Sequence, residues 1–391
     1  MAALMLLGLS AGCSGQGGKA SGDDSAQGEA DIIEQFADTL VSPHYAKGFT
    51  LLEASEGPLE GAMLLQVTDP WQGANGESRS LLMLPEGKSA PDSYAGRAIS
   101  WPARRLVVMS STHVSMLEAL GVADRIVGVS GKRYISSPAL RARIDDVAEV
   151  GHEGNADYEA LATARPDLVL LYGVSAANPM EPKLREMGIP YIYIGDYLEE
   201  DPLGKAEWLL AIGALTGRLK EAREAFEPVA ESYMQTAGLV SSFAKHPYPK
   251  VMFNATTGDG WFMPGADSYM VRLIRDAGGE YVYEGNPGTQ SKVIGMEEAW
   301  RLLSKADYWL NPGSAASMDE LRAAEPRMMD APAVANGKVW NNTLLTNAGG
   351  GNDFFESGAV RPDRVLLDLV GILHPELSDS VRAPVYYRHL Q

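Results

Sequence analysis

The sequence is poor in cysteine, in histidine and in positive charge. Cys13 is the single cysteine among 391 residues, so an internal disulfide and a zinc site built on cysteines are both excluded. The formal net charge is −18, which argues against nucleic acid and against an electrostatic hold on anionic lipid, because both need clustered Lys and Arg. The six histidines do not share an element at metal-ligand spacing, so we expect neither a protein-bound metal nor a cofactor.

Catalytic signatures are missing as well. Residues 8–12 match the Gly-x-Ser-x-Gly pattern of hydrolases, but they do not lie on a strand, turn and helix. His152 and Glu153 are not followed by a second histidine four residues later. The glycines at 349–351 do not open a dinucleotide-binding unit. We therefore predict a protein that is not an enzyme and has no catalytic residues.

The first residues have the pattern of a secretory signal. Residues 2–11 are apolar, end in small side chains and are too few to span a bilayer. The run from Leu9 to Cys13 resembles the lipobox of bacterial lipoproteins, which implies cleavage before Cys13 and acylation of its thiol. Residues 14–28 are rich in Gly, Ser and Gln, as in a flexible tether. No Lys or Arg precedes the apolar run, so a true start upstream of Met1 is also an option.

The rest of the chain changes pattern twice. Strands separated by turns are predicted up to about residue 100, and short apolar runs then alternate with helical segments. This alternation predicts two Rossmann-like α/β lobes with parallel central sheets, bridged by one long helical segment that Pro228 should kink or divide. The expected parts are a signal and tether at 1–30, a small β appendage at 31–103, a first lobe at 104–202, a helical linker at 203–248 and a second lobe at 249–391.

Several stretches resemble the periplasmic binding proteins of the importers for ferric siderophores, haem and cobalamin. In the first lobe they are residues 118–121, 125–129 and 158–169; in the second they are 261–265, 276–279 and 352–377. The last of these is similar to the Bacteroidetes-type lipoprotein form of the family. The order and spacing of the stretches, more than any single motif, carry the resemblance, which covers roughly residues 104–377.

The resemblance implies two acidic residues that dock onto a membrane permease. Glu159 stands seven residues before Pro166, where family members carry such a glutamate. The second-lobe equivalent is Glu297 or Glu298, and the spacing does not choose between them. One carboxylate per lobe would mainly set the encounter rate and the register with a basic partner surface.

The cargo site is predicted from the rule that ligands bind at the carboxyl ends of parallel strands. Aromatic and polar side chains dominate the loops that follow the predicted strands, as a large conjugated cargo requires. Arg133 could pair with a cargo carboxylate or catecholate, and His113 or a tyrosine could ligate haem iron. The candidate cargo residues are His113, Arg133, Tyr134, Tyr172, Tyr197, Trp261, Phe262, Asn347 and Phe354.

Together these features predict a monomeric, lipid-anchored extracytoplasmic protein of an ABC importer. It would capture a metal chelate in the cleft between its lobes and deliver it to a permease and its ATPase, touching the membrane only through its anchor. Two alternatives remain. One is a lipid-anchored hydrolase acting through Asp353 and Glu356 in the same cleft, and the other is a surface receptor that works without a permease.

Overall fold

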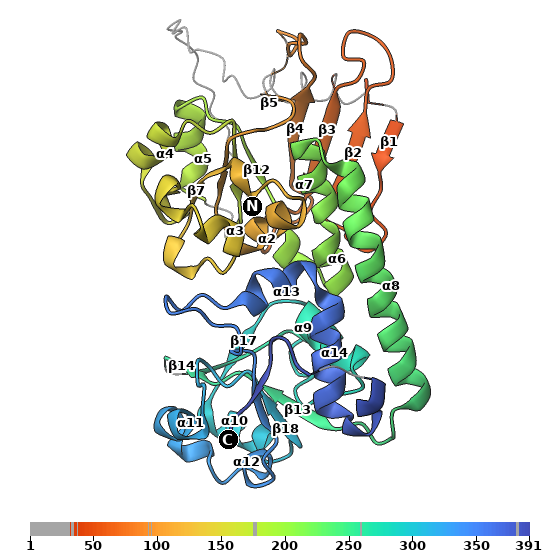
Figure 1. Cartoon of the computed structure of the whole chain (residues 1–391), viewed down its shortest axis with the longest axis vertical. Helices are drawn as coiled ribbons and strands as arrows, with labels where there is room; N and C mark the ends of the chain where they lie inside the picture. Colours follow the sequence, from red (N-terminus) through yellow and green to blue (C-terminus); the bar gives the residue numbers. More distant parts are fainter. Residues whose placement is uncertain are drawn as a thin grey trace, which may run out of the picture.

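The computed structural model describes residues 32, 35–36, 38–92, 94, 96–174, 178–258, 260–380 and 383–391. The predicted signal, the tether and Cys13 lie outside these residues. The N-terminal sheet and the first α/β lobe lie side by side at one end of the long axis, and the second α/β lobe lies at the other end (Figure 1). Within the described part of the chain, no helix is long and apolar enough to cross a membrane.

The N-terminal sheet contains five strands in sequence order. They are β1 Asp38–Val41, β2 Phe49–Glu53, β3 Met63–Thr68, β4 Ser78–Leu84 and β5 Arg97–Ser100, antiparallel except for the parallel pair β4–β5. Successive side chains of a strand point to opposite faces of the sheet, and apolar residues occur at both kinds of position, so both faces of this sheet are apolar. Leu65 and Val67 belong to the core of the first lobe, whereas Leu64 and Leu82 pack with Ile32 and Phe36 on the other face. The sheet is therefore continuous with the lobe and is not a separate tethered module.

The first lobe has a five-stranded parallel sheet in the order β12-β11-β6-β7-β8. Its strands are β6 Leu106–Val108, β7 Ile126–Val129, β8 Ala148–Glu149, β11 Leu168–Leu171 and β12 Tyr191–Tyr193. The near-continuous burial of β6, β7, β11 and β12 is what a parallel sheet covered on both faces requires, whereas the short edge strand β8 is not buried. The helices of this lobe are α2 Ser111–Ala119, α3 Pro138–Arg141, α4 Tyr158–Ala164, α5 Met180–Glu186, α6 Pro202–Glu207 and α7 Leu209–Thr216.

The second lobe repeats the scheme in the order β16-β13-β18-β19-β20. The strands β13 Lys250–Phe253, β16 Glu280–Tyr281, β18 Tyr308–Leu310 and β19 Val339–Asn341 are parallel, and β20 Arg388–His389 is an antiparallel edge strand. A smaller sheet joins β14 Thr256–Thr257, β15 Gly260–Met263 and β17 Lys292–Ile294. The helices are α9 Tyr269–Asp276, α10 Met296–Leu303, α11 Met318–Ala324, α12 Pro332–Ala335, α13 Ser357–Val360 and α14 Pro362–Leu373.

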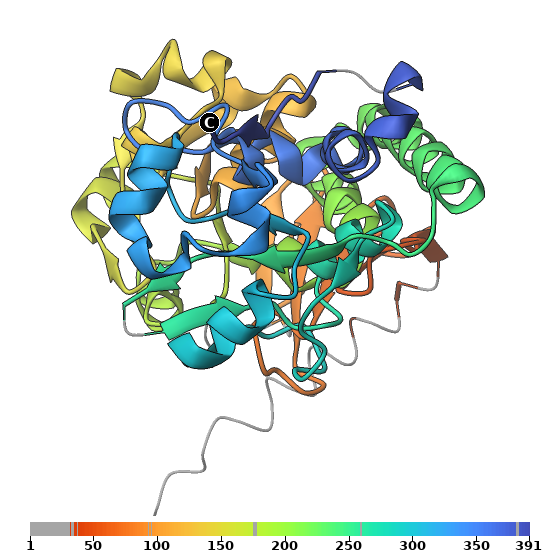
Figure 2. The same ribbon diagram turned by 90° about the horizontal axis from the view of Figure 1, so that it is seen from below.

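One helix, α8 Leu219–Phe243, runs from the first lobe to the second and packs against α7 and α14 (Figures 1 and 2). Its 25 residues give a length of roughly 37 Å at 1.5 Å per residue. Pro228 was expected to kink or divide this segment, and the division is wrong because α8 continues through it as one helix. A proline inside a helix costs about 3 kcal/mol, but Pro228 is on the exposed face, where water can satisfy the freed carbonyl. Burial of Phe226, Val229 and Tyr233 contributes about 1.5–3 kcal/mol each, which outweighs that cost.

A second contact between the lobes is made by α13. After β19 the chain continues to α13, and this helix packs against α2 and α6 of the first lobe. The predicted architecture, two α/β lobes bridged by a long helix with an N-terminal sheet, is confirmed, except that β20 makes the second sheet mixed. Two connections restrict how far the lobes can swing apart, so large hinge motion is disfavoured.

Candidate functional site

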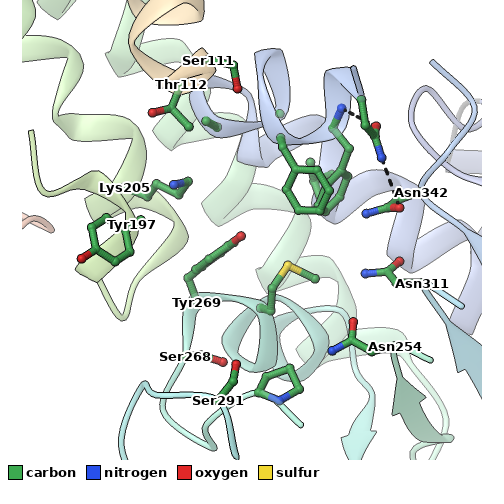
Figure 3. Close-up of a pocket in the computed structure, with 18 of the residues that line it drawn as sticks. Ser111, Thr112, Tyr197, Lys205, Asn254, Ser268, Tyr269, Ser291, Asn311 and Asn342 are labelled. Atoms are coloured by element: carbon green, nitrogen blue, oxygen red, sulfur yellow. Dashed lines mark hydrogen bonds between the residues drawn. The ribbon is translucent and has the colours of Figure 1, made fainter. Parts of the chain in front are cut away.

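A cleft of about 1230 Å³ lies between the two lobes. It is formed where strands end: Met109 follows β6, Tyr172 follows β11, Asn254 follows β13 and Asn311 follows β18. The carboxyl edges of the two sheets thus face the same space (Figure 3). Its volume exceeds the 300–1,000 Å³ or so typical of small-molecule pockets.

The first-lobe wall carries a pair of tyrosines. The rings of Tyr172 and Tyr197 are 4.4 Å apart, and the Tyr197 hydroxyl donates to the carbonyl of Gly173 at 2.7 Å. Burial raises the pKa of Tyr172, and burial also raises the pKa of Tyr197 to about 12. Both hydroxyl groups are therefore protonated at physiological pH, and the two rings present an aromatic surface on this wall.

A buried ion pair lies beside these tyrosines. The Lys205 ammonium is 2.6 Å from the Asp196 carboxylate and 5.2 Å from the ring centre of Tyr269. Burial works against the charge of Lys205, but the Asp196 carboxylate outweighs it and the pKa of Lys205 is raised. Lys205 lines the cleft, whereas Asp196 is fully buried behind it. The pair presents a compensated positive charge to any cargo.

The second-lobe wall is a row of asparagine amides. Asn254, Asn311 and Asn342 immediately follow the neighbouring strands β13, β18 and β19, and Figure 3 shows them side by side. Asn254 and Asn311 have φ values of 66° and 56°, a left-handed conformation that asparagine tolerates better than most residues. The Asn254 amide donates to the carbonyl of Phe262 at 2.7 Å. This wall offers uncharged donors and acceptors.

Three aromatic rings that line the cleft remain substantially exposed. Tyr134 is 43% exposed, Phe262 41% and Phe355 52%. The Arg133 guanidinium covers one face of the Tyr134 ring at 4.4 Å and is bonded to its hydroxyl. Exposed aromatic surface gathered in one concave site is a feature of ligand-binding clefts.

Of the predicted cargo residues, five line the cleft: Tyr134, Tyr172, Tyr197, Phe262 and Phe354. Arg133 and Asn347 lie next to lining residues without lining the cleft themselves. Asn347 donates from its amide to the carbonyl of Ile135 at 2.9 Å, which is a contact between the lobes. These two residues are placed at the rim.

The expectation that Trp261 faces the cleft is wrong. Its side chain is fully buried, and its indole N–H donates to the carbonyl of Phe253 at 2.7 Å. Side chains alternate along β15, so Phe262 points outward where Trp261 points into the core.

The structure likewise does not place His113 at the cleft surface. This histidine is fully buried in α2, with Nε2 3.9 Å from a carboxylate oxygen of Asp196. Burial lowers the pKa of His113 to about 4, although Asp196 opposes that shift. His113 is therefore neutral, and it lies behind the cleft wall rather than among the residues that line the cleft.

The carboxylates of the hydrolase alternative are already engaged. Glu356 accepts the backbone N–H groups of Ser136 and Ser137, at 2.7 and 2.6 Å, and Asp353 accepts the Ser357 hydroxyl at 2.6 Å. Both contacts hold backbone and loop in place, which favours a structural role. Among the described residues, no three His, Cys, Asp or Glu side chains gather as a metal site.

The three candidate docking acids are Glu159 on the first lobe and Glu297 and Glu298 on the second. Glu159, in the first turn of α4, and Glu297, in the first turn of α10, are both exposed. Glu298 is less exposed and lies 3.4 Å from Arg301. Within the part of the chain that the structure describes, Glu297 has no ion pair.

Sequence reasoning did not identify Lys205, Gln72 or the three asparagines, all of which line the cleft. The asparagines could have been found, because each comes at the carboxyl end of a strand, where ligands are expected to bind. Lys205 is part of a short helix, and nothing in its sequence surroundings distinguishes it from a solvated lysine.

Two α/β lobes closing on a shared cleft define a two-lobed binding protein. The sequence profile of the periplasmic binding protein family matches residues 106–341, and the chain belongs to that family. The predicted resemblance is confirmed at this level. An uncharacterised lipoprotein of Methanocaldococcus jannaschii is 27% identical over 292 residues, which are 72% of this chain and 67% of the relative.

Solved structures show the same fold. A periplasmic haem-binding protein of Pseudomonas aeruginosa aligns with a TM-score of 0.59 at 16% identity, covering 74% of this chain and 98% of that protein. A periplasmic vitamin B12-binding protein of Vibrio cholerae aligns with a TM-score of 0.52 at 15% identity, covering 70% and 97%. Between 26% and 30% of this chain therefore has no counterpart in these two structures, which are themselves almost wholly matched.

Proposed function

We propose that this protein is the extracytoplasmic cargo-binding component of an ABC importer and that its cargo is a metal chelate of the siderophore, haem or corrinoid kind. The observation that carries the proposal is the cleft of about 1230 Å³ lined by partly exposed aromatic rings in a member of the periplasmic binding protein family. A sugar or amino acid would leave most of that volume filled with water.

The polar groups of the cleft narrow the cargo chemistry. Glu199 and Lys205 are the charged side chains among the residues that line it, and both are paired inside the protein. The asparagine row and the tyrosine hydroxyls supply the remaining hydrogen bonds. Such a site suits a large conjugated or macrocyclic chelate whose periphery carries amide, hydroxyl or carbonyl groups and whose net charge is small.

The delivery step relies on one exposed acid per lobe. Glu159 and Glu297 would meet basic residues on a permease, and the lipid on Cys13 would keep the protein at the membrane surface. The lipoprotein naming of the Methanocaldococcus jannaschii relative supports the anchor. The protein would act there as a monomer, without chemistry of its own.

Direct titration tests the proposal. A soluble form that begins after Cys13 is mixed with haemin, cyanocobalamin and the ferric complexes of a catecholate and a hydroxamate chelator, and binding is followed by calorimetry and intrinsic fluorescence. We expect sub-micromolar binding of one of them. Failure to bind any of them, with clear binding of a sugar or peptide, would overturn the cargo class.

A further inference from the structure

The N-terminal sheet reaches the cleft through the loop between β3 and β4. We call residues 69–77 the hairpin loop. Gln72, on this loop, is among the residues that line the cleft, and its side chain is exposed. All the other lining residues come from Met109 onward, within the two lobes and the segments that join them. The cleft therefore has a contribution from a part of the chain that precedes both lobes.

The hairpin loop is internally ordered. The backbone N–H of Asp69 donates to the carbonyl of Glu77 at 2.8 Å, and the N–H of Gly76 donates to the Asp69 carboxylate at 2.7 Å. A further turn bond runs from the N–H of Ala74 to the carbonyl of Trp71 at 3.0 Å. These bonds fix the backbone on both sides of Gln72, so its side chain is presented from a defined position.

The loop is also fastened to the first lobe. Trp71 is buried and its ring meets Tyr193 edge-on at 5.7 Å. The Arg79 guanidinium lies over the Trp71 ring at 4.7 Å and is 3.7 Å from the Glu181 carboxylate. An aromatic ring enclosed in this way contributes roughly 1.5–3 kcal/mol of burial alone, enough to hold a loop of this size in one place.

Close backbone contact brings the loop against the tyrosine wall. The carbonyl oxygen of Pro70 would be 2.6 Å from a Cβ at Gly173, so the approach requires glycine there, and Gly173 also has φ +78°. The same Gly173 carbonyl accepts the Tyr197 hydroxyl. The backbone N–H of Gln72 faces that hydroxyl and partly offsets the rise that burial causes in the pKa of Tyr197. Gln72 therefore lies beside the Tyr172–Tyr197 pair, whose rings are tilted against each other.

We propose that the hairpin loop is a third wall of the cargo site and that Gln72 is a specificity-determining residue whose side-chain amide hydrogen-bonds a carbonyl, hydroxyl or carboxylate group on the periphery of the cargo. This inference rests on the proposed function. The family match begins at residue 106, so the hairpin loop is an addition to the matched scaffold. The N-terminal sheet thereby acquires a role in selecting cargo.

The test compares substitutions at two positions on the same loop. Gln72→Ala removes the amide and Gln72→Trp places bulk inside the cleft, whereas Asn75→Trp places equal bulk on an exposed residue that does not line it. Each protein is titrated with haemin, cyanocobalamin and the two ferric chelates. We expect Gln72→Ala to weaken binding roughly three- to tenfold, as for one lost hydrogen bond, and Gln72→Trp to weaken it more than about tenfold.

Asn75→Trp should stay within about twofold of the unaltered protein. The ratio of the affinities for two chelates should also change in the Gln72 variants. Partial unfolding of the sample would reduce binding of every chelate by the same factor and so cannot change this ratio. Unchanged binding by both Gln72 variants would overturn the role of the loop and leave the proposed function standing. Failure of the unaltered protein to bind any chelate would overturn the proposed function, and this inference with it.

Discussion

Glu356 of the second lobe binds the backbone of Ser137 in the first lobe. A carboxylate oxygen of Glu356 accepts the Ser137 N–H at 2.6 Å, and the other accepts the N–H of Ser136 at 2.7 Å. Asn347 reinforces the contact by donating to the carbonyl of Ile135. This junction joins the lobes through a nearly inaccessible carboxyl group.

We expect Glu356 to make stability depend on pH. Burial raises the pKa of Glu356 to about 7 from its usual 4.5, against the effect of the two N–H donors. The folded protein therefore binds more protons than the unfolded chain between pH 4.5 and 7, and stability is lost as the pH rises through that window. The contribution is on the order of 2–3 kcal/mol.

Thermal unfolding of Glu356→Gln from pH 4.5 to 8 tests this expectation. Relative to the variant, the unaltered protein should lose melting temperature as the pH rises towards 7. Glu227→Gln, an exposed glutamate on α8, is the matched control and should run parallel to the unaltered protein. Parallel curves for Glu356→Gln as well would contradict ionisation of this carboxyl in the window.

His113 should give the opposite dependence. Burial lowers the pKa of His113 to about 4 from 6.5, so its contribution is complete above pH 6.5 and is lost as the pH falls towards 4. The loss by pH 4 is on the order of 3 kcal/mol. His113→Gln, which cannot titrate, should show a flatter acid limb in the same unfolding series. His246→Gln is the control, because His246 is exposed.

The architecture could be predicted well from the sequence, because strands and helices leave regular patterns of apolar residues. Continuous apolar runs such as 168–171 mark strands covered on both faces, and they identified both sheets. Individual side chains were harder to place. Trp261 and Phe262 are neighbours on β15, and only the register of that strand decides which one enters the core. Gln72 could not be predicted as a cleft residue for a different reason. Its position depends on how the N-terminal sheet packs against the first lobe, and no local sequence pattern encodes that packing.

The exposed aromatic rings of the cleft should carry much of the affinity for cargo. Phe262→Ala is expected to weaken binding of the chelate roughly ten- to a hundredfold, because an aromatic contact covered by ligand is worth about 1.5–3 kcal/mol. Phe243→Ala is the matched control, since Phe243 is 66% exposed at the end of α8 and does not line the cleft. Calorimetric titration of both variants measures the difference. Equal loss in both would show that the effect is not local to the cleft.

Docking to a permease should depend on surface charge without involving the cleft. Glu159→Arg and Glu297→Arg reverse one exposed charge on each lobe, and we expect each to slow uptake about tenfold or more while affinity for the chelate stays unchanged. Glu298→Arg should have a smaller effect, because this residue already pairs with Arg301. Glu227→Arg, on the exposed face of α8, controls for the change in net charge.

The readout is uptake of the labelled chelate by cells that carry each variant, together with calorimetry on the purified proteins. Because charge pairs at the rim of an interface act mainly on the encounter rate, raising the salt concentration should narrow the gap between the unaltered protein and Glu159→Arg. A variant that loses affinity and uptake together would point to a damaged fold. Normal uptake by both Glu159→Arg and Glu297→Arg would remove these acids from the docking surface and direct attention to other exposed carboxylates of the two lobes.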